Sequence, residues 1–254
     1  MKIFKELSDI IYKTNDTGEF FFKDDIIDFN DCCISFKIFF DHKMNFYLEK
    51  KYNNTVEKEI ERDVNILNSK YSKFIVQYAY KDQDRIVIPY YPMRTFYSLI
   101  TNKHKNINHA HFSFVDKIVM ILEIATALQD LHLHDEYHGN LCSQFVYIDS
   151  NKDAYLGNFC FDRINEASDT KPKGPLYYRP PDIFDLTIFE KNEVDEKYIK
   201  KEQKIDIYSI GVLMHEFITE KSPIDRMGNM PRKQRICTIK YNYIDFLFSG
   251  DNNE

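Results

Sequence analysis

Four short segments hold the polar side chains that could do chemistry in this chain. The first contains His138 and Asn140, the second contains Asn158, and the third and fourth supply the carboxylates of Asp182 and Asp206. An imidazole exchanges a proton near neutral pH, whereas a carboxamide forms hydrogen bonds but cannot take up a proton. Magnesium also prefers anionic oxygens. The two asparagines are therefore poor candidates for a general base or for a magnesium ligand.

A second chemical interpretation starts from three histidines. His132, His134 and His138 form an H-x-H-x-x-x-H pattern that could suggest zinc. This spacing fits no common zinc site, so no metal site is predicted.

The first third of the chain predicts strands and one helix. Residues 1–24 indicate an N-terminal arm, and residues 26–51 alternate apolar and polar side chains as strands do. Residues 55–68 carry apolar side chains about one helical turn apart, which predicts an exposed helix. Two more strands are expected at 74–80 and 85–91. The sheet would then have about five strands.

The remainder predicts mainly helices. Ser113 and Asp116 match a capping box. The helix that follows should bury one apolar stripe, made of Ile118, Ile121, Leu122, Ala125 and Leu128. Residues 146–148 and 154–156 indicate a short hairpin, residues 184–203 a solvated insertion, and Asp206 begins another helix that extends to about Thr219.

The order and spacing of the four polar segments resemble the C-terminal lobe of a eukaryotic protein kinase, most closely in the tyrosine-kinase-like group. The segments read His138-Gly-Asn-Leu-Cys-Ser-Gln-Phe145, Asn158-Phe-Cys160, Tyr178-Arg-Pro-Pro-Asp182 and Asp206-Ile-Tyr-Ser-Ile-Gly211. The family's patterns are H-R-D-L-x-x-x-x-N, D-F-G, A-P-E and D-x-W-S-x-G. The first segment is similar to the loop of Janus-family pseudokinase domains.

The resemblance implies an α+β, bilobal protein-kinase-like fold. A small antiparallel sheet lobe with one helix would occupy residues 25–91, after the arm of residues 1–24. A larger, mostly helical lobe would occupy residues 92–254, with its C-terminal helices truncated.

At the chemical positions of the family, the resemblance implies losses. The base position is Asn140, and the two metal-ligand positions are Phe145 and Asn158. A shift of register does not restore the acid, because no aspartate lies between Asp135 and Asp149. The stretch at the family's glycine-rich loop, residues 28–33, contains no glycine and is a poor phosphate cradle.

Other positions match the family. The resemblance implies nucleotide-binding roles for Lys50, Asp63 and Ile88, with Lys51 as the competing register for the lysine. Asp63 is shorter than the usual glutamate, and two solvated charges are the alternative to a Lys50–Asp63 ion pair. It also implies a structural motif, in which Asp206 binds the loop backbone and His138 and Phe159 pack between the lobes. The motif comprises His138, Phe159, Arg179, Asp182 and Asp206.

These features predict a pseudokinase that is not an enzyme and that acts as a scaffold or allosteric signalling module. No cofactor is expected, with ATP bound without magnesium as the exception, and the partner would be a protein such as an active kinase. The alternative is a divergent, active ATP-dependent serine/threonine or tyrosine kinase that uses Asp149 or Asp162. A third interpretation is a truncated gene product without function, suggested by the missing helices.

The composition excludes several other classes. The formal net charge of −6 gives no electrostatic reason to expect nucleic acid or an anionic membrane as a partner. Five cysteines without a C-x-x-C pair favour a reducing compartment. The N-terminus has charges within its would-be apolar stretch, and no apolar run is long enough to span a bilayer. A cytoplasmic location is therefore expected.

Overall fold

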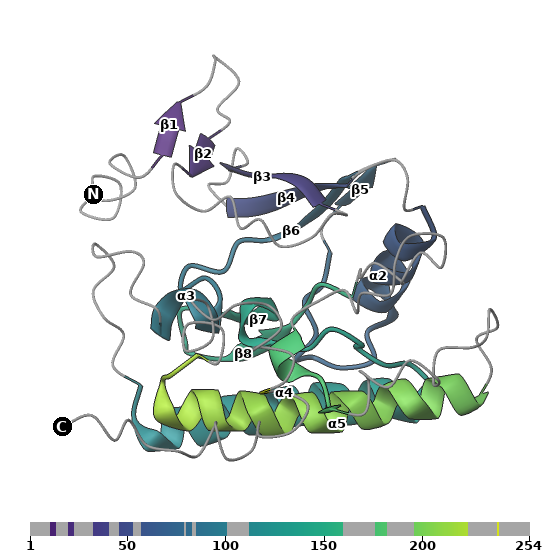
Figure 1. The fold of residues 1–254 in the computed structure, drawn as a ribbon. Helices are drawn as coiled ribbons and strands as arrows, with labels where there is room; N and C mark the ends of the chain where they lie inside the picture. Colours follow the sequence, from purple (N-terminus) through teal and green to yellow (C-terminus); the bar gives the residue numbers. More distant parts are fainter. Residues whose placement is uncertain are drawn as a thin grey trace.

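The structure is a computed structural model. It describes residues 11–13, 20–22, 33–40, 46–52, 57–78, 80–82, 85–100, 112–159, 176–181, 196–222 and 238. In Figure 1 the strands β1–β6 form an upper layer, and the helices α4 and α5 form the lowest one.

The upper layer is an antiparallel sheet of six strands in the order β1-β2-β3-β4-β6-β5. The strands are β1 (Ile11–Lys13), β2 (Phe20–Phe22), β3 (Cys33–Phe40), β4 (Phe46–Tyr52), β5 (Tyr80–Asp82) and β6 (Arg85–Pro89). The expected strand at 74–80 is wrong for its described part up to Tyr78. There Ile75 forms only an isolated bridge to Leu156. Ile75 and Val76 are instead buried against the core.

Helix α2 (Glu57–Ser69) confirms the helix expected at 55–68. Its buried side chains Asp63, Val64, Ile66 and Leu67 alternate with the exposed Glu61, Asn65 and Asn68. The helix therefore turns one face toward the core and one toward solvent, and the buried face includes a carboxylate.

Helix α4 (Phe114–Leu133) begins with the predicted capping box. The Ser113 hydroxyl accepts from Asp116 N at 3.1 Å, and the Asp116 carboxylate accepts from Ser113 N at 2.8 Å. The expected apolar stripe is partly wrong, because Leu122 is 60% exposed. The buried face is centred instead on Met120, Ile124, Ala127, Leu128 and Leu131.

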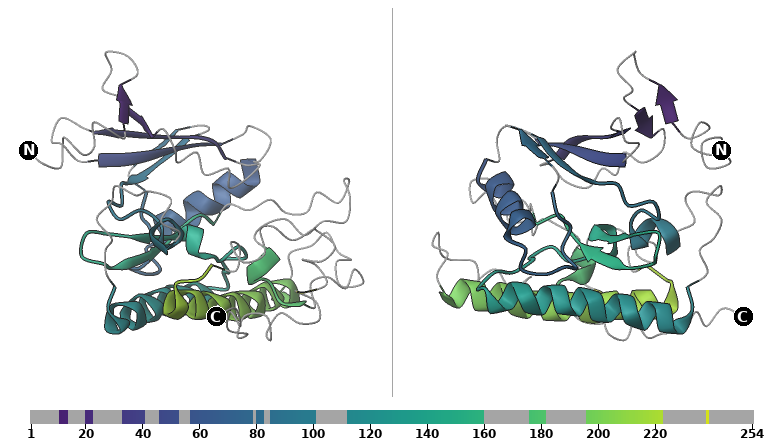
Figure 2. Two further views of the ribbon diagram at one scale, coloured as in Figure 1. Left: turned by 60° about the vertical axis from the view of Figure 1, so that its left-hand side comes forward. Right: turned by 180° about the vertical axis from the view of Figure 1, so that it is seen from behind.

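Helix α5 (Glu196–Thr219) begins earlier than expected, so the described part of the predicted insertion, from residue 196 to 203, is helical. It lies beside α4 in an antiparallel arrangement (Figure 2). Lys117 of α4 contacts Glu220 just after α5 at 2.7 Å, whereas His132 at the other end of α4 contacts Asp206 at 3.0 Å. None of the described helices is long and apolar enough to cross a membrane.

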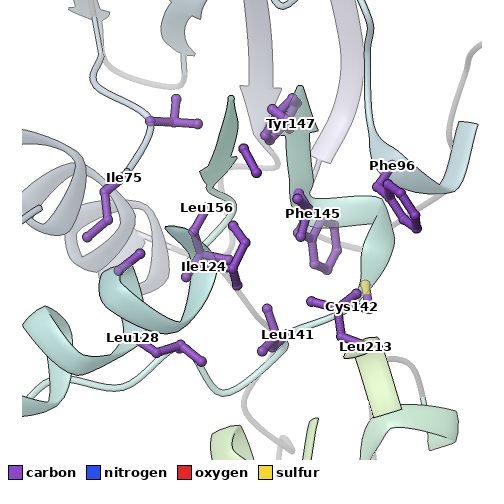
Figure 3. Close-up of a cluster of buried hydrophobic side chains, with 14 of the residues drawn as sticks. Ile75, Phe96, Ile124, Leu128, Leu141, Cys142, Phe145, Tyr147, Leu156 and Leu213 are labelled. Carbon is purple, nitrogen blue, oxygen red and sulfur yellow. The ribbon is translucent and has the colours of Figure 1, made fainter. Parts of the chain in front are cut away.

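Short elements lie between the sheet and the two long helices. They are α3 (Phe96–Ile100), η1 (Ser143–Phe145), β7 (Val146–Ile148), β8 (Ala154–Leu156) and η2 (Leu176–Tyr178). Strands β7 and β8 confirm the predicted hairpin. One hydrophobic cluster joins these elements to α2, α4 and α5. Figure 3 shows Phe145 and Cys142 in this cluster, with Leu213 of α5 below them. The core thereby fixes the loop of residues 138–145 between the layers.

Candidate functional site

The loop that begins at His138 is anchored by a buried carboxylate of α5. Asp206 is fully buried, and its two oxygens accept from His138 N at 2.7 Å and Gly139 N at 2.8 Å. The ring nitrogen Nε2 of His132 lies 3.0 Å from the same carboxylate. Hydrogen bonds to an ionised acceptor are the strong ones in proteins. The start of this loop is therefore fixed by long-range contacts with a helix that follows it by more than sixty residues.

His138 is held as a neutral ring in the core. Its Nε2 donates to Gly157 O at 3.2 Å, and its Nδ1 accepts from Asn140 N at 3.2 Å. The ring packs against Phe159 with 4.9 Å between centroids. Burial lowers the pKa of His138 to about 4, although Asp206, the Gly157 carbonyl and Asp63 oppose the shift. The imidazole thus joins the loop to residues 157–159 as a structural group.

This depressed pKa predicts a pH dependence of stability. Because the unfolded chain takes up the proton near pH 6.5 and the folded chain only near pH 4, stability is lost as pH falls between these values. The contribution of His138 to the free energy of unfolding should decrease by about 2 kcal/mol as the pH is lowered from 7 to 5. Urea unfolding at several pH values checks this against His138→Gln, whose amide can donate to Gly157 O but does not titrate. Parallel pH curves for the two proteins would contradict it.

The family's base position and its two metal-ligand positions are buried in this chain and offer no anionic oxygen. Asn140 and Asn158 are 3% and 5% exposed. Both amide atoms of Asn140, and Nδ2 of Asn158, have no hydrogen-bond partner among the described residues. Phe145 is part of the hydrophobic cluster (Figure 3). These side chains do not fit a magnesium site, because magnesium wants near-octahedral oxygen ligands with carboxylates among them.

The predicted nucleotide-binding residues lie in three different elements. Lys50 and Ile88 are on the neighbouring strands β4 and β6, and Ile88 is fully buried. The side chain of Lys50 lies outside the described part of the structure. Asp63 on α2 is fully buried, and its Oδ1 accepts from Phe159 N at 2.8 Å. Asp63 therefore has a structural contact with the 157–159 segment that the sequence did not indicate.

Two further predicted residues concern the segment after η2. The Arg179 guanidinium donates to Gly139 O at 2.8 Å, so it contacts the loop at the position where the family has an arginine. Asp182 lies outside the described residues.

The alternative acid Asp149 accepts from Asn151 N and Asp153 N, at 2.8 Å and 2.9 Å, and so holds the turn between β7 and β8. The other alternative acid, Asp162, is outside the described residues.

Sequence reasoning missed a buried polar network below the loop. Ser143 donates to Glu216 Oε1 at 2.8 Å and lies 3.1 Å from the Tyr178 hydroxyl, which itself donates to Glu216 Oε2. All three residues are fully buried, and burial raises the pKa of Tyr178 well above its ordinary value. The signal was present, because Glu216 follows Val212 by four residues on the buried face of a helix. This network joins η1, η2 and α5.

The three histidines that suggested zinc have separate partners. His132 contacts Asp206, and His138 contacts Gly157 O. The ring of His134 bonds to Asp130 O and stacks on Tyr71 at 4.0 Å between centroids. The described residues contain no group of three or more His, Cys, Asp or Glu side chains that could hold a metal ion.

Comparison with known proteins gives the family. Residues 46–242 match the family model described as protein tyrosine and serine/threonine kinase. A probable leucine-rich repeat receptor-like protein kinase of Arabidopsis thaliana, IMK3, is 28% identical over 76% of this chain. A probable inactive receptor kinase of the same plant, RLK902, is 26% identical over 58% of it. An Aurora kinase of Patiria pectinifera is 25% identical over 55%. The matches cover 24%, 21% and 32% of these relatives, so the chain spans less than a third of their length.

These comparisons contradict one expectation. The lost acidic residues suggested that the chain is not an enzyme, but its family model is a kinase model and its relatives include an Aurora kinase. The inference failed because it treated the combined loss of the base, metal-ligand and phosphate positions as the loss of all activity. General base catalysis typically contributes a factor of about 10² to 10⁴ in rate, so removing it slows phosphotransfer without abolishing it.

Proposed function

Because the chain belongs to the protein tyrosine and serine/threonine kinase family, we propose that it acts mainly by binding a protein partner. Its role is that of a scaffold or allosteric module in signalling, and its own phosphotransfer is slow. The proposed partner is an active protein kinase. The similarity of its loop to Janus-family pseudokinase domains fits this role.

One observation carries the proposal: the framework of the site is held while its chemical positions are neutral. Asp206, His138 and Arg179 hold the loop through backbone contacts. Asn140 and Asn158 in the same region can neither accept a proton nor supply a charged metal ligand. A rigid framework is what a binding surface needs, whereas fast phosphotransfer also needs the missing charges.

The same observation bears on the cofactor. ATP binding, where it occurs, should be weak and independent of magnesium, because the two metal-ligand positions hold a buried phenyl ring and a carboxamide. The relative named as a probable inactive receptor kinase is a second reason to expect slow chemistry in this chain.

A divergent, active serine/threonine or tyrosine kinase is the second candidate function. The matches to kinases, including the Aurora kinase, favour it. Asp149 is a poor substitute base, because its carboxylate already accepts two backbone hydrogen bonds in the β7–β8 turn. Asp162 remains the acid to substitute in a test of this candidate.

Phosphotransfer and partner regulation can be measured together. The purified chain is incubated with Mg-ATP and a mixed peptide substrate, beside Asn140→Asp/Asn158→Asp. We expect the native chain to turn over far below the roughly 1–100 s⁻¹ of ordinary kinases, and the double variant to gain at least about tenfold. In parallel, the chain is added to a panel of purified active receptor kinases and Aurora kinases. We expect a change of several fold in kcat or KM for at least one of them.

Two other results would contradict this proposal, each in a different way. Turnover within the ordinary kinase range that is lost in Asp162→Asn would favour the second candidate. An unchanged panel, together with slow native turnover, would contradict the regulatory role. Asn65→Asp/Asn68→Asp adds the same two charges at exposed positions of α2 and is the matched control for the double variant.

A further inference from the structure

Arg62 of α2 contacts two separate segments of the larger lobe. Its guanidinium donates to Phe159 O at 2.8 Å, to Tyr137 O, and to the Glu136 carboxylate at 3.3 Å. It also lies over the Tyr137 ring, 4.4 Å from the centroid. One side chain thus reaches both the segment before His138 and the segment after Asn158.

The next residue completes this contact. Asp63 accepts from Phe159 N at 2.8 Å, so the amide and the carbonyl of Phe159 are held by two successive residues of α2. Asp63 is fully buried, and Arg62 is partly buried, with 17% of its side chain exposed. Charge-assisted hydrogen bonds in such a poorly solvated place are stronger than surface ion pairs. Phe159 cannot move away from α2 without losing both.

The loop on the other side of Arg62 is held in the same way. Four backbone groups in residues 137–139 bind three charged side chains from three parts of the chain. Arg62 binds Tyr137 O, Asp206 binds His138 N and Gly139 N, and Arg179 binds Gly139 O. Together with Asp63, these side chains are two guanidinium groups and two carboxylate groups, so their formal charges balance without a metal ion or a phosphate group.

We propose that Arg62 is the positioning residue of a charged clamp that couples α2 to the His138 loop and to Phe159. The clamp consists of Arg62, Asp63, Arg179 and Asp206. It keeps α2 in one position on the larger lobe without nucleotide, metal or phosphorylation. Arg62 contacts both segments and so transmits a displacement of α2 to both, while Asp63 transmits it to Phe159 as well. This inference does not rest on the proposed function, since it holds for a slow kinase and for an active one.

Hydrogen exchange of single amides tests the clamp, because the amide of Phe159 is bound by Asp63 and those of His138 and Gly139 by Asp206. Arg62→Met keeps an unbranched stem and removes the guanidinium. We expect exchange at Phe159 to accelerate about tenfold or more in Arg62→Met and in Asp63→Ala. Asp63→Asn keeps an oxygen acceptor and should restore most of the protection. Glu61→Gln, at the exposed neighbouring position, should change nothing.

Loss of global stability has a different signature. Ile124→Val destabilises the core without touching the clamp, so it should lower the melting temperature and leave exchange at Phe159 unchanged under native conditions. Unaltered Phe159 exchange in Arg62→Met would overturn the proposal. Faster exchange at Phe159 in the native chain after EDTA or phosphatase treatment would overturn it as well, because it would show that a metal ion or a phosphate holds the segment.

Discussion

Replacing Asn158 with aspartate is expected to lower the free energy of unfolding by roughly 3 kcal/mol at pH 7 without divalent cations. The reason is charge alone. Asn158 is 5% exposed and has a φ of 67°, a left-handed conformation that asparagine and aspartate both tolerate. The two side chains are also nearly the same size. A carboxylate at this place would be removed from water.

The pH dependence gives this prediction a second readout. Burial raises the pKa of a carboxyl group, so the folded variant should take up a proton above the ordinary aspartate pKa. The destabilisation is then complete above the folded pKa and vanishes below about pH 4, where both states are protonated. Urea unfolding from pH 4 to pH 8 checks this. The control is Asn65→Asp, which places the same charge on the exposed face of α2.

Magnesium tests whether a negative charge at position 158 is enough to create a metal site. A carboxylate at position 158 would provide an anionic oxygen, so millimolar Mg²⁺ should recover part of the lost stability of Asn158→Asp. The native chain should show no such recovery, because Asn140, Phe145 and Asn158 provide none. Equal magnesium-induced shifts in melting temperature for both proteins would show that another group binds the ion.

Replacing Asp206 with alanine should destabilise the fold by roughly 3–5 kcal/mol. The substitution leaves the amides of His138 and Gly139 without their acceptor in a buried place, and it removes the contact with His132. Each buried, unsatisfied donor carries a desolvation penalty of about 1–3 kcal/mol. Chemical denaturation measures the loss.

Two comparisons make this second prediction specific. Lys204→Ala removes a charge from an exposed position of the same helix and should change stability by less than about 0.5 kcal/mol. Asp206→Asn keeps one oxygen acceptor but turns an amide donor toward a second donor. Its loss of stability should therefore lie between those of Lys204→Ala and Asp206→Ala. A loss of less than about 1 kcal/mol in Asp206→Ala would mean that the loop keeps its conformation without this anchor.

Local patterns were sufficient for several elements. The capping box at Ser113, the helix over Glu57–Ser69 and the hairpin of β7 and β8 all depend on residues close together in the chain. Such interactions are set by backbone geometry and by neighbouring side chains, so the sequence predicts them well. The expected insertion failed at residues 196–203, because a charged segment can extend a helix whose other end is buried.

Long-range contacts were beyond the reach of these patterns. The helical period placed Leu122 on a buried stripe, but the elements packed against α4 cover a neighbouring face of the helix. The Leu122 side chain is therefore exposed. The spacing of Asp63 suggested a lysine partner, yet its carboxylate also binds the backbone of a residue 96 positions away. Nothing near Arg62 in the sequence indicates that its partners are carbonyls of Tyr137 and Phe159.

The sequence by itself determined the order of the elements, the family resemblance and the replacement of the acidic groups at Asn140 and Asn158. Side-chain type alone fixes whether a group can carry charge, so these conclusions needed no coordinates. Only the tertiary structure decided which charged side chains hold the His138 loop, and that Ser143, Tyr178 and Glu216 form one buried network. The physical reason is that a buried charge is stabilised by whatever the fold brings beside it, and those partners lie far away along the chain.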